Sequence, residues 1–223
     1  MIMTRHFDEE LAKFKETLLT MGSYAESSVA QAIQAVTDRN DKLAEQVQHN
    51  DDIMDRYEIE IDDTAIHLLA KAPLATDLRL ITVAMKISQN LERVGDEATT
   101  IARRALELNG EPQLKSYVDI PRMVAITLGM LKESLDAFVN KDPEKARAVI
   151  PRDKEVDALN RQLYRELSSF MVENPSTITR CLNLMTVSKS LERVADHATN
   201  IAEEVVYLCE ARDIRHEANQ PPP

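Results

Sequence analysis

Residues 91–102 read LERVGDEATTIA, and the same pattern returns at residues 191–202 as LERVADHATNIA. Nine of the twelve positions are identical. Met85 with Met185, and a serine three residues later in each copy, extend the match at the same spacing of 100 residues. Self-similarity at a fixed spacing indicates a duplicated structural unit. We therefore expect a chain made of two equivalent halves.

The composition favours helices over strands. The chain has 223 residues with only 4 glycines, 4% aromatic residues and no Trp, and it contains long runs of Ala, Leu, Glu, Arg, Lys and Met. These are residues that helices accommodate well. A hydrophobic content of 43% is enough to build a sizeable core. We predict an all-α fold.

Start and stop signals divide the chain into six long helical segments. The first ends at residues 38–40, the second at Ala72-Pro73 and the third at Gly110, because proline disfavours helical geometry in the preceding residue and glycine caps helix ends. Asp142 can cap the fifth segment, which we expect to kink or restart at Pro151. The expected segments run approximately over 7–37, 41–71, 74–109, 121–140, 142–173 and 176–211.

Three of these segments precede the connection at residues 110–121, and the other three come after it. At about 30 residues and 1.5 Å per residue, a segment spans about 45 Å. Antiparallel neighbours of that length form long bundles. We predict two tandem, internally repeated three-helix bundles, at residues 1–110 and 111–212, followed by a disordered tail at residues 213–223.

The acidic residues of the repeated motif lie away from the predicted core. At about 100° per residue, Glu92 and Asp96 fall nearly opposite the centre of an apolar seam on the same helix. Glu192 and Asp196 occupy the same positions in the second copy. The seam alternates steps of three and four residues, as in a heptad pattern. It consists of Ala84, Ile87, Leu91, Val94, Ala98, Ile101, Ala105 and Leu108.

A second acidic pair, Asp51 and Asp55, lies at a matching height on the preceding segment. Asp55 precedes the turn at Leu74 by nearly as many positions as Glu92 follows it. The same holds for Asp51 and Asp96, and in each case the two counts differ by a single position. Antiparallel packing would therefore bring the two pairs level.

The second half repeats this register. Counted from Pro175, Asp157 lies one position further back than Glu192 lies forward, and Asp153 and Asp196 show the same relation. We expect four carboxylates to converge in each half.

Converging carboxylates either raise one another's pKa or bind a cation. In both copies the Glu and the Asp of the motif are like charges one turn apart, which costs about 0.2–0.5 kcal/mol. Their own helix supplies no cation at a spacing of four residues, and Arg93 and Arg193 project about 100° away. Hard oxygen ligands suit Mg, Mn, Ca or Fe. We predict one surface metal site in each half; the alternative is an ordinary solvated acidic face.

Charge and hydropathy argue against a nucleic-acid-binding protein and against a membrane-spanning one. A net charge of −11 and a pI near 5.0 argue against a nucleic-acid-binding surface, which needs a basic stripe. No apolar stretch approaches the roughly 20 residues that span a bilayer. The two cysteines lie within helical patterns, and no apolar signal region follows the first residues. We expect a cytoplasmic protein.

The sequence carries no recognised catalytic motif. It has no glycine-rich phosphate loop, no nucleophile elbow and no zinc-type cysteine spacing. A ferritin-like di-iron centre needs Glu-x-x-His pairs facing the core, and the chain contains no Glu-x-x-His. We therefore expect no enzyme. The competing interpretations are a metal-dependent enzyme or metal store that uses the acidic grooves, and a purely structural helical scaffold.

These motifs resemble those of the PhoU family. The resemblance rests on the duplicated twelve-residue segments, on residues 6–11 (HFDEEL) and on Met21-Gly22, and it covers nearly the whole chain. It implies two three-helix bundles whose Glu/Asp-x-x-x-Asp motifs bind metal ions or multinuclear metal clusters at the surface, with Mg, Mn, Fe, Zn and Ni as candidates. The implied ligands are Glu92, Asp96, Glu192, Asp196, Asp51, Asp55, Asp153 and Asp157.

The resemblance also implies a function. Proteins of this kind are negative regulators of the phosphate-starvation response that act by contact rather than catalysis. The implied partners are the ATP-binding subunit of a phosphate-specific ABC transporter and a phosphate-sensing histidine kinase, with membrane contact only through these partners, and a second copy of the chain in a homodimer. The two motif copies differ at Gly95 and Ala195 and at Thr100 and Asn200, which puts equal metal binding by the two halves in doubt.

Overall fold

The computed structural model describes residues 2–71 and 74–215, with side chains from His6 onward, and this part of the chain is all-α, as predicted. The expected break at Ala72-Pro73 and residues 216–223 of the expected tail lie outside the described residues. The helices are α1 (Ile2–Thr37), α2 (Asp41–His49), α3 (Asp52–Leu69), α4 (Ala75–Asn109), α5 (Asp119–Asn140), α6 (Pro143–Val149), α7 (Asp153–Glu173) and α8 (Ile178–Glu210), with short 3₁₀ helices η1 (Ile150–Arg152) and η2 (Pro175–Thr177).

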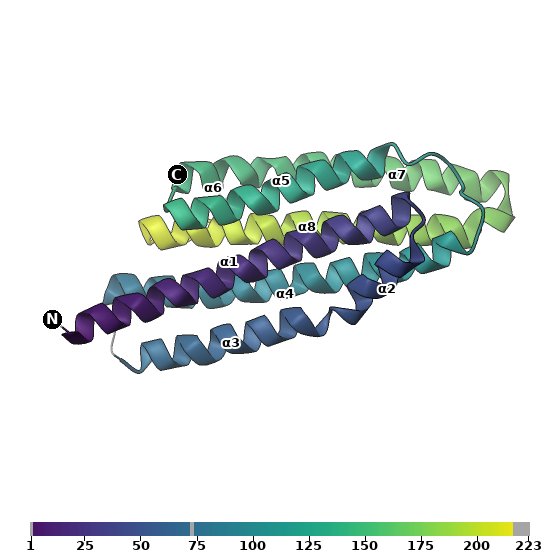
Figure 1. Ribbon diagram of the computed structural model, residues 1–223. Helices are drawn as coiled ribbons and strands as arrows, with labels where there is room; N and C mark the ends of the chain where they lie inside the picture. Colours follow the sequence, from purple (N-terminus) through teal and green to yellow (C-terminus); the bar gives the residue numbers. More distant parts are fainter. Residues whose placement is uncertain (1, 72–73, 216–223) are drawn as a thin grey trace, which may run out of the picture.

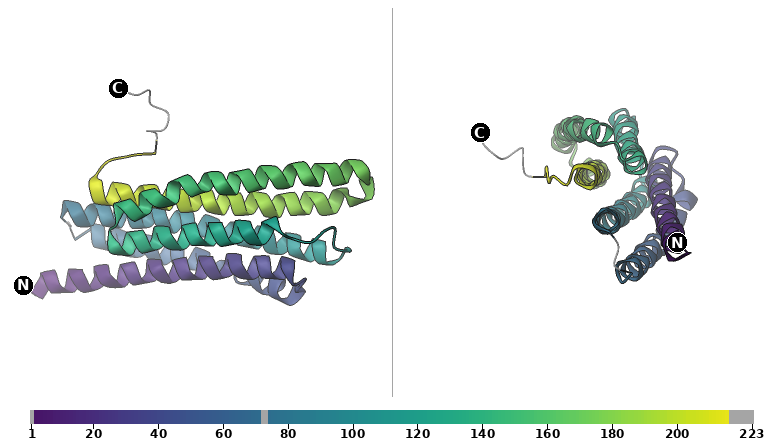
Figure 2. Two further views of the ribbon diagram at one scale, coloured as in Figure 1. Left: turned by 90° about the horizontal axis from the view of Figure 1, so that it is seen from above. Right: turned by 90° about the vertical axis from the view of Figure 1, so that its left-hand side faces the viewer.

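The helices lie side by side along one long axis (Figures 1 and 2). In the first half α4 packs against α1, α2 and α3, and in the second half α8 packs against α5, α6 and α7. The prediction of two repeated three-helix bundles is therefore confirmed. The bundles also share one continuous core, because α4 lies along α8 and α1 lies against α5. Within the described residues, no helix is both long and apolar enough to cross a membrane.

The central helix α4 is buried on two sides. Every residue of the predicted seam, from Ala84 to Leu108, is buried. Further positions of α4 beside the seam are also buried, and they include Ile81, Ser88 and Ala102. A helix with apolar residues on more than one stripe belongs inside an assembly. The second stripe exists because α4 meets its own bundle on one side and α8 on the other.

The second segment of the first half is broken, so the expectation of one helix over residues 41–71 is wrong. α2 ends at His49 and α3 starts at Asp52, with Asn50 at φ −89° and ψ 4° between them. Asn and Asp side chains compete with helical backbone hydrogen bonds, and residues 50–52 read NDD. The second half restarts at the equivalent place, in η1 at Pro151, as predicted.

These two breaks determine where the acidic pairs begin. Asp51 immediately precedes α3, and Asp153 is the first residue of α7. The first carboxylate of each pair therefore lies at the restart of a helix, where an anionic group also interacts favourably with the helix dipole.

α4 and α8 run antiparallel, and polar pairs cross their interface. Arg193 Nη1 lies 3.0 Å from Glu97 Oε1, and Lys86 Nζ lies 3.1 Å from Glu204 Oε2. From Lys86 to Glu97 the residue number rises along α4, while that of the partner falls along α8 from Glu204 to Arg193. The repeated motifs therefore lie level with each other across the interface.

Gly95 allows a close approach between α4 and α3. A Cβ atom at this position would lie 2.8 Å from Cγ and 3.3 Å from Cβ of Met54. The repeat places Val156 where the first half has Met54, and there the glycine is replaced by Ala195. The shorter valine accompanies the larger alanine, so the two differences between the halves are complementary.

Gly95→Ala is expected to lower the free energy of unfolding by about 1 kcal/mol, because overpacking against Met54 exceeds the gain in helix propensity. In a Met54→Val background, which copies the second half, the same substitution should be neutral or stabilising. Urea unfolding of the four proteins of this cycle measures the coupling. Equal effects of Gly95→Ala in both backgrounds would contradict the packing explanation.

Candidate metal centre

The first half gathers the acids that the register predicted. Burial raises the pKa of Glu92, and the charges of Asp96, Glu58 and Asp55 raise it further. Burial also raises the pKa of Asp96, with contributions from Asp51 and Asp55. These mutual effects need short distances between α3 and α4. The four predicted carboxylates of this half are therefore within electrostatic reach of one another.

A threonine of the repeated motif orients this group. Thr99 Oγ1 donates a hydrogen bond of 2.8 Å to Asp51 Oδ1, which ties the helix restart of α3 to α4. In the second half the equivalent atoms, Thr199 Oγ1 and Asp153 Oδ1, are both buried without a hydrogen-bond partner. The same residue types therefore leave a carboxylate oxygen unpaired in one half and paired in the other.

The expectation that the helix of the first motif supplies no cation is wrong. Arg93 Nε lies 3.3 Å from Glu92 Oε2, and Arg93 Nη1 lies 3.2 Å from Asp96 Oδ2. The long side chain of an arginine can bend around the helix, so the angular separation of the Cα positions does not keep its charge away. One guanidinium therefore bridges Glu92 and Asp96.

The second half uses a different cation. Lys189 pairs with Glu192 three residues later, and Arg161 Nη1 lies 3.3 Å from Asp157 Oδ2. Lys189 lies three residues before Glu192, so neighbours at a spacing of four residues do not include it. Burial and the charges of Asp196, Asp157 and Glu192 raise the pKa of Asp153 to about 6.

Asp196 completes this second group. Burial raises its pKa first, and the charges of Glu192 and Asp157 add to the effect. The four acids of the predicted second set therefore influence one another's charge, as those of the first set do: Asp153, Asp157, Glu192 and Asp196.

The α4–α8 interface explains why the two arginines of the motif behave differently. Arg193 crosses the interface to Glu97, which is buried. The residue equivalent to Glu97 is His197, whose pKa is lowered by burial and by the charges of Arg93 and Arg193. His197 Nδ1 instead lies 3.0 Å from Asn90 Oδ1. A histidine thus occupies the place of the acid in the second copy, and Arg93 pairs with Glu92 and Asp96 of its own helix.

Glu58 was not predicted, yet it belongs to the first acidic group. Burial raises its pKa, as do the charges of Asp62, Asp55 and Asp96. It follows Asp55 by three residues on α3, a spacing that could have revealed it. Its equivalent in the second half is Asn160, so the first group is the more acidic.

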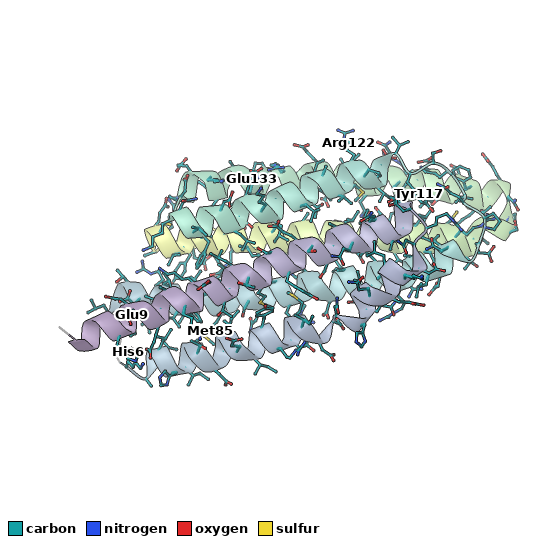
Figure 3. All side chains as sticks on the ribbon, in the orientation of Figure 1. His6, Glu9, Met85, Tyr117, Arg122 and Glu133 are labelled. Atoms are coloured by element: carbon teal, nitrogen blue, oxygen red, sulfur yellow. The ribbon has the colours of Figure 1, made fainter. Side chains whose placement is uncertain are left out.

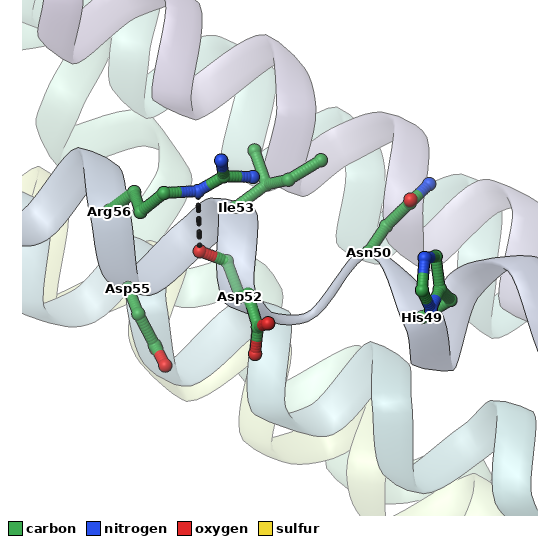
Figure 4. A pocket seen from close by; sticks show the side chains of 6 residues that line it. All are labelled: His49, Asn50, Asp52, Ile53, Asp55 and Arg56. Atoms are coloured by element: carbon green, nitrogen blue, oxygen red, sulfur yellow. Dashed lines mark hydrogen bonds between the residues drawn. The ribbon is translucent and has the colours of Figure 1, made fainter.

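An open hollow of about 480 Å³ adjoins the first group at the break between α2 and α3 (Figure 4). Asp55 belongs to both, and Arg56 Nε donates a hydrogen bond of 3.2 Å to the backbone carbonyl of Asp52. The hollow is lined by His49, Asn50, Asp52, Ile53, Asp55 and Arg56. Of the four predicted carboxylates of this half, Asp55 lines the hollow.

The donor set suits a hard cation. None of the eight predicted ligands is fully buried, and all of them are carboxylates. The unpaired buried oxygen of Asp153 and the raised pKa values show that negative charge is only partly balanced. Among the described side chains, no three Asp, Glu, His or Cys residues are assembled into a group that could hold a metal ion as placed. Use of the eight carboxylates as ligands stays a prediction.

The duplicated three-helix bundle, with an acidic motif in each half, defines a class of all-α repeat proteins. The sequence matches the family described as the PhoU domain twice, over residues 18–105 and 120–205. The chain therefore belongs to the PhoU family, as the motifs indicated.

Relatives and solved structures agree over nearly the whole chain. A phosphate-specific transport system accessory protein PhoU homolog of Pseudomonas aeruginosa is 40% identical over 216 residues, which cover 96% of this chain and 89% of the relative. The corresponding protein of Caulobacter vibrioides is 42% identical over 207 residues, 90% of each chain. The crystal structure of PhoU from Pseudomonas aeruginosa superposes with a TM-score of 0.89, covering 92% of this chain and 100% of that one at 40% identity. The phosphate transport system regulatory protein PhoU from Streptococcus pneumoniae, 27% identical, gives 0.88 over 93% and 99% of the two chains.

The raised pKa of Asp153 predicts a pH-dependent stability in the metal-free protein. The folded state holds this proton more tightly than the unfolded state, so the stabilisation is complete below about pH 4 and is lost as the pH rises through about 6. Because the carboxyl group is partly exposed, solvent screening limits the effect to about 1 kcal/mol. Asp153→Asn should therefore flatten the decline in unfolding free energy between pH 5 and 7.5.

Chemical denaturation in EDTA measures this difference. Glu155→Gln, which removes an exposed acid from the same helix, is the matched control and should leave the pH dependence as in the wild type. Parallel pH profiles for Asp153→Asn and the wild type would contradict the assignment.

Proposed function

We propose that this protein is a negative regulator of the phosphate-starvation response. It would act as an adaptor between the ATP-binding subunit of a phosphate-specific ABC transporter and a phosphate-sensing histidine kinase. The observation that carries the proposal is the match, over at least 90% of the chain, to relatives named as accessory proteins of the phosphate-specific transport system. Two solved structures of PhoU proteins share the whole architecture.

The geometry of the acidic groups favours contact over catalysis. Their carboxylates are on shallow, partly exposed surfaces, and several are already paired with Arg93, Lys189 or Arg161. A catalytic centre benefits from a water-excluded site in which charges act strongly. The alternative, a metal-dependent enzyme or metal store, would use the same carboxylates. As an adaptor the protein would work in the cytoplasm, as a homodimer, and would reach the membrane through its partners.

We further propose that each acidic group binds a hard cation that stabilises the adaptor. The first group would use Glu92 and Asp96 with Asp51 and Asp55, and the second the equivalent residues of α7 and α8. Mg, Mn, Fe, Zn and Ni are the candidate ions, and cellular availability would decide among them. Support comes from the raised pKa values and from Arg93, a protein cation that already bridges Glu92 and Asp96.

Deletion of the gene is expected to raise the expression of phosphate-starvation genes severalfold in phosphate-rich medium, because a negative regulator would be lost. A reporter fused to a starvation-induced promoter measures the effect, and a plasmid copy of the gene should reverse it. In phosphate-starved cells, where the response is already active, deletion should change little. Unchanged reporter expression in rich medium would overturn the proposed regulation.

Arg93→Ala is expected to tighten Mn²⁺ binding by the first half about fivefold, since an ion pair worth about 1 kcal/mol no longer competes with the metal. Calorimetric titration of the metal-free protein measures this affinity. Glu92→Ala with Asp96→Ala should remove one of two binding equivalents.

Arg193→Ala is the matched comparison, because it changes the equivalent arginine, whose partner is Glu97 rather than one of the predicted metal ligands. It should affect Mn²⁺ affinity less than Arg93→Ala does. Failure of the wild type to bind any of the candidate ions would overturn the metal proposal and leave the adaptor role in place.

A further inference from the structure

The second half carries a basic groove on α7 and α8 that the acidic motifs do not explain. The groove is open, has a volume of about 460 Å³ and is lined by Asn160, Arg161, Tyr164, Arg165 and Lys189. All three charged residues that line it are cations, although the whole chain has a net charge of −11. An acidic protein repels a negatively charged partner over most of its surface. The groove is a local basic patch to which such a partner would be attracted.

The first half has the same helix packing as the second, but different side chains at the positions of the groove. The equivalent positions, in the same order, are Glu58, Ile59, Asp62, Asp63 and Gln89. The five positions thus carry three acids and no cation in the first half, and three cations and no acid in the second. The buried positions between them stay apolar, with Ile61 and Ala65 in α3 and Leu163 and Leu167 in α7. The helix packing is kept while the outward side chains are exchanged, as expected when a surface acquires a role of its own.

The cations of the groove are incompletely neutralised. Arg161 contacts Asp157 and Lys189 contacts Glu192, both at the edge of the second acidic group. Arg165 is exposed and forms no ion pair with any side chain that the structure describes. Arg161 and Arg165 are like charges one helical turn apart, an arrangement that an isolated helix disfavours. An anionic partner would remove this repulsion.

The shape of the groove favours a chain segment over a single small anion. The lining residues of α7 extend over more than a turn in the middle of the helix, where the backbone N–H groups are already used in helical hydrogen bonds and cannot cradle an oxyanion. Tyr164 is 38% exposed between the two arginines in sequence and offers an apolar surface. Tyrosine and arginine are the residue types that dominate binding energy in protein interfaces.

We propose that this groove docks an acidic segment of a protein partner, with Asp or Glu side chains against Arg161, Arg165 and Lys189 and an apolar side chain against Tyr164. The inference rests on the proposed adaptor function, and it names the surface and the chemistry of one of its contacts. The acidic face of α3, at the equivalent place in the first half, would repel the same segment. The partner would therefore distinguish the two halves of the duplicated chain.

The test uses the full chain with the purified ATP-binding subunit and the cytoplasmic portion of the sensor kinase from the same organism. Arg161→Glu with Arg165→Glu should weaken binding to at least one of them more than tenfold, and the loss should shrink as salt increases. The matched control is Arg103→Glu with Arg122→Glu, which makes the same change of charge at exposed sites on α4 and α5; Arg122 points away from the bundle in Figure 3. The control should stay within twofold of the wild type.

Equal binding by the groove variant and the wild type would overturn the inference while leaving the adaptor function in place. If the wild type binds neither protein, the adaptor function fails, and a second measurement decides on the groove. For this, a short poly-L-glutamate peptide is titrated at low salt, and amide NMR shifts are followed along α7. Shifts at the groove that disappear in the groove variant would support the site.

Absence of such shifts would overturn the groove. Displacement of the peptide by inorganic phosphate at equal concentration would also overturn it, in favour of a small-anion site. Circular dichroism melting of each variant checks that the fold is kept.

Discussion

The arrangement of the other helices depends on the antiparallel packing of α4 on α8. Both helices are buried on more than one side, and every other helix packs on one or the other of them. The contact combines apolar stripes with polar pairs, Arg193 with Glu97 and Lys86 with Glu204, that fix the relative height of the two helices. Because the repeated motifs lie on these two helices, the same contact also determines how far apart the two acidic groups are and which way they face.

This contact also decides the charge balance of the acidic groups. Glu97 holds Arg193 at the interface, whereas His197 at the equivalent place leaves Arg93 to bridge Glu92 and Asp96. One substitution in a duplicated motif thus changes the electrostatics of a site on the other side of the helix. The second group receives Lys189 instead, and it keeps an unpaired carboxylate oxygen on Asp153. The two copies of the motif therefore differ in how much of their negative charge is already balanced by protein cations.

The halves have diverged mainly in their outward-facing residues. Buried positions of α3 and α7 stay apolar because burying a polar group without a hydrogen-bond partner is costly. Positions outside the fully buried core are free of that constraint, and there Glu58, Asp62 and Asp63 correspond to Asn160, Tyr164 and Arg165. The duplication supplied two similar frameworks, and the substitutions gave one an acidic and the other a partly basic face. For an adaptor with more than one partner, such a difference would provide two distinct contact surfaces.

The sequence by itself determined the helical class, the duplication, the seam of α4 and the level placement of the carboxylates, because these follow from periodicity within a helix and from counting residues back from a turn. It also contained the restart at Pro151, whereas the break at Asn50 carried a weaker signal and was missed. Only the tertiary structure decided that the two bundles share one core, that Arg93 and Lys189 reach the acids, and that Arg193 does not. The reason is physical: the direction of a long charged side chain depends on the partners across an interface, and residues far apart in the chain, such as Glu97 and Arg193, supply them.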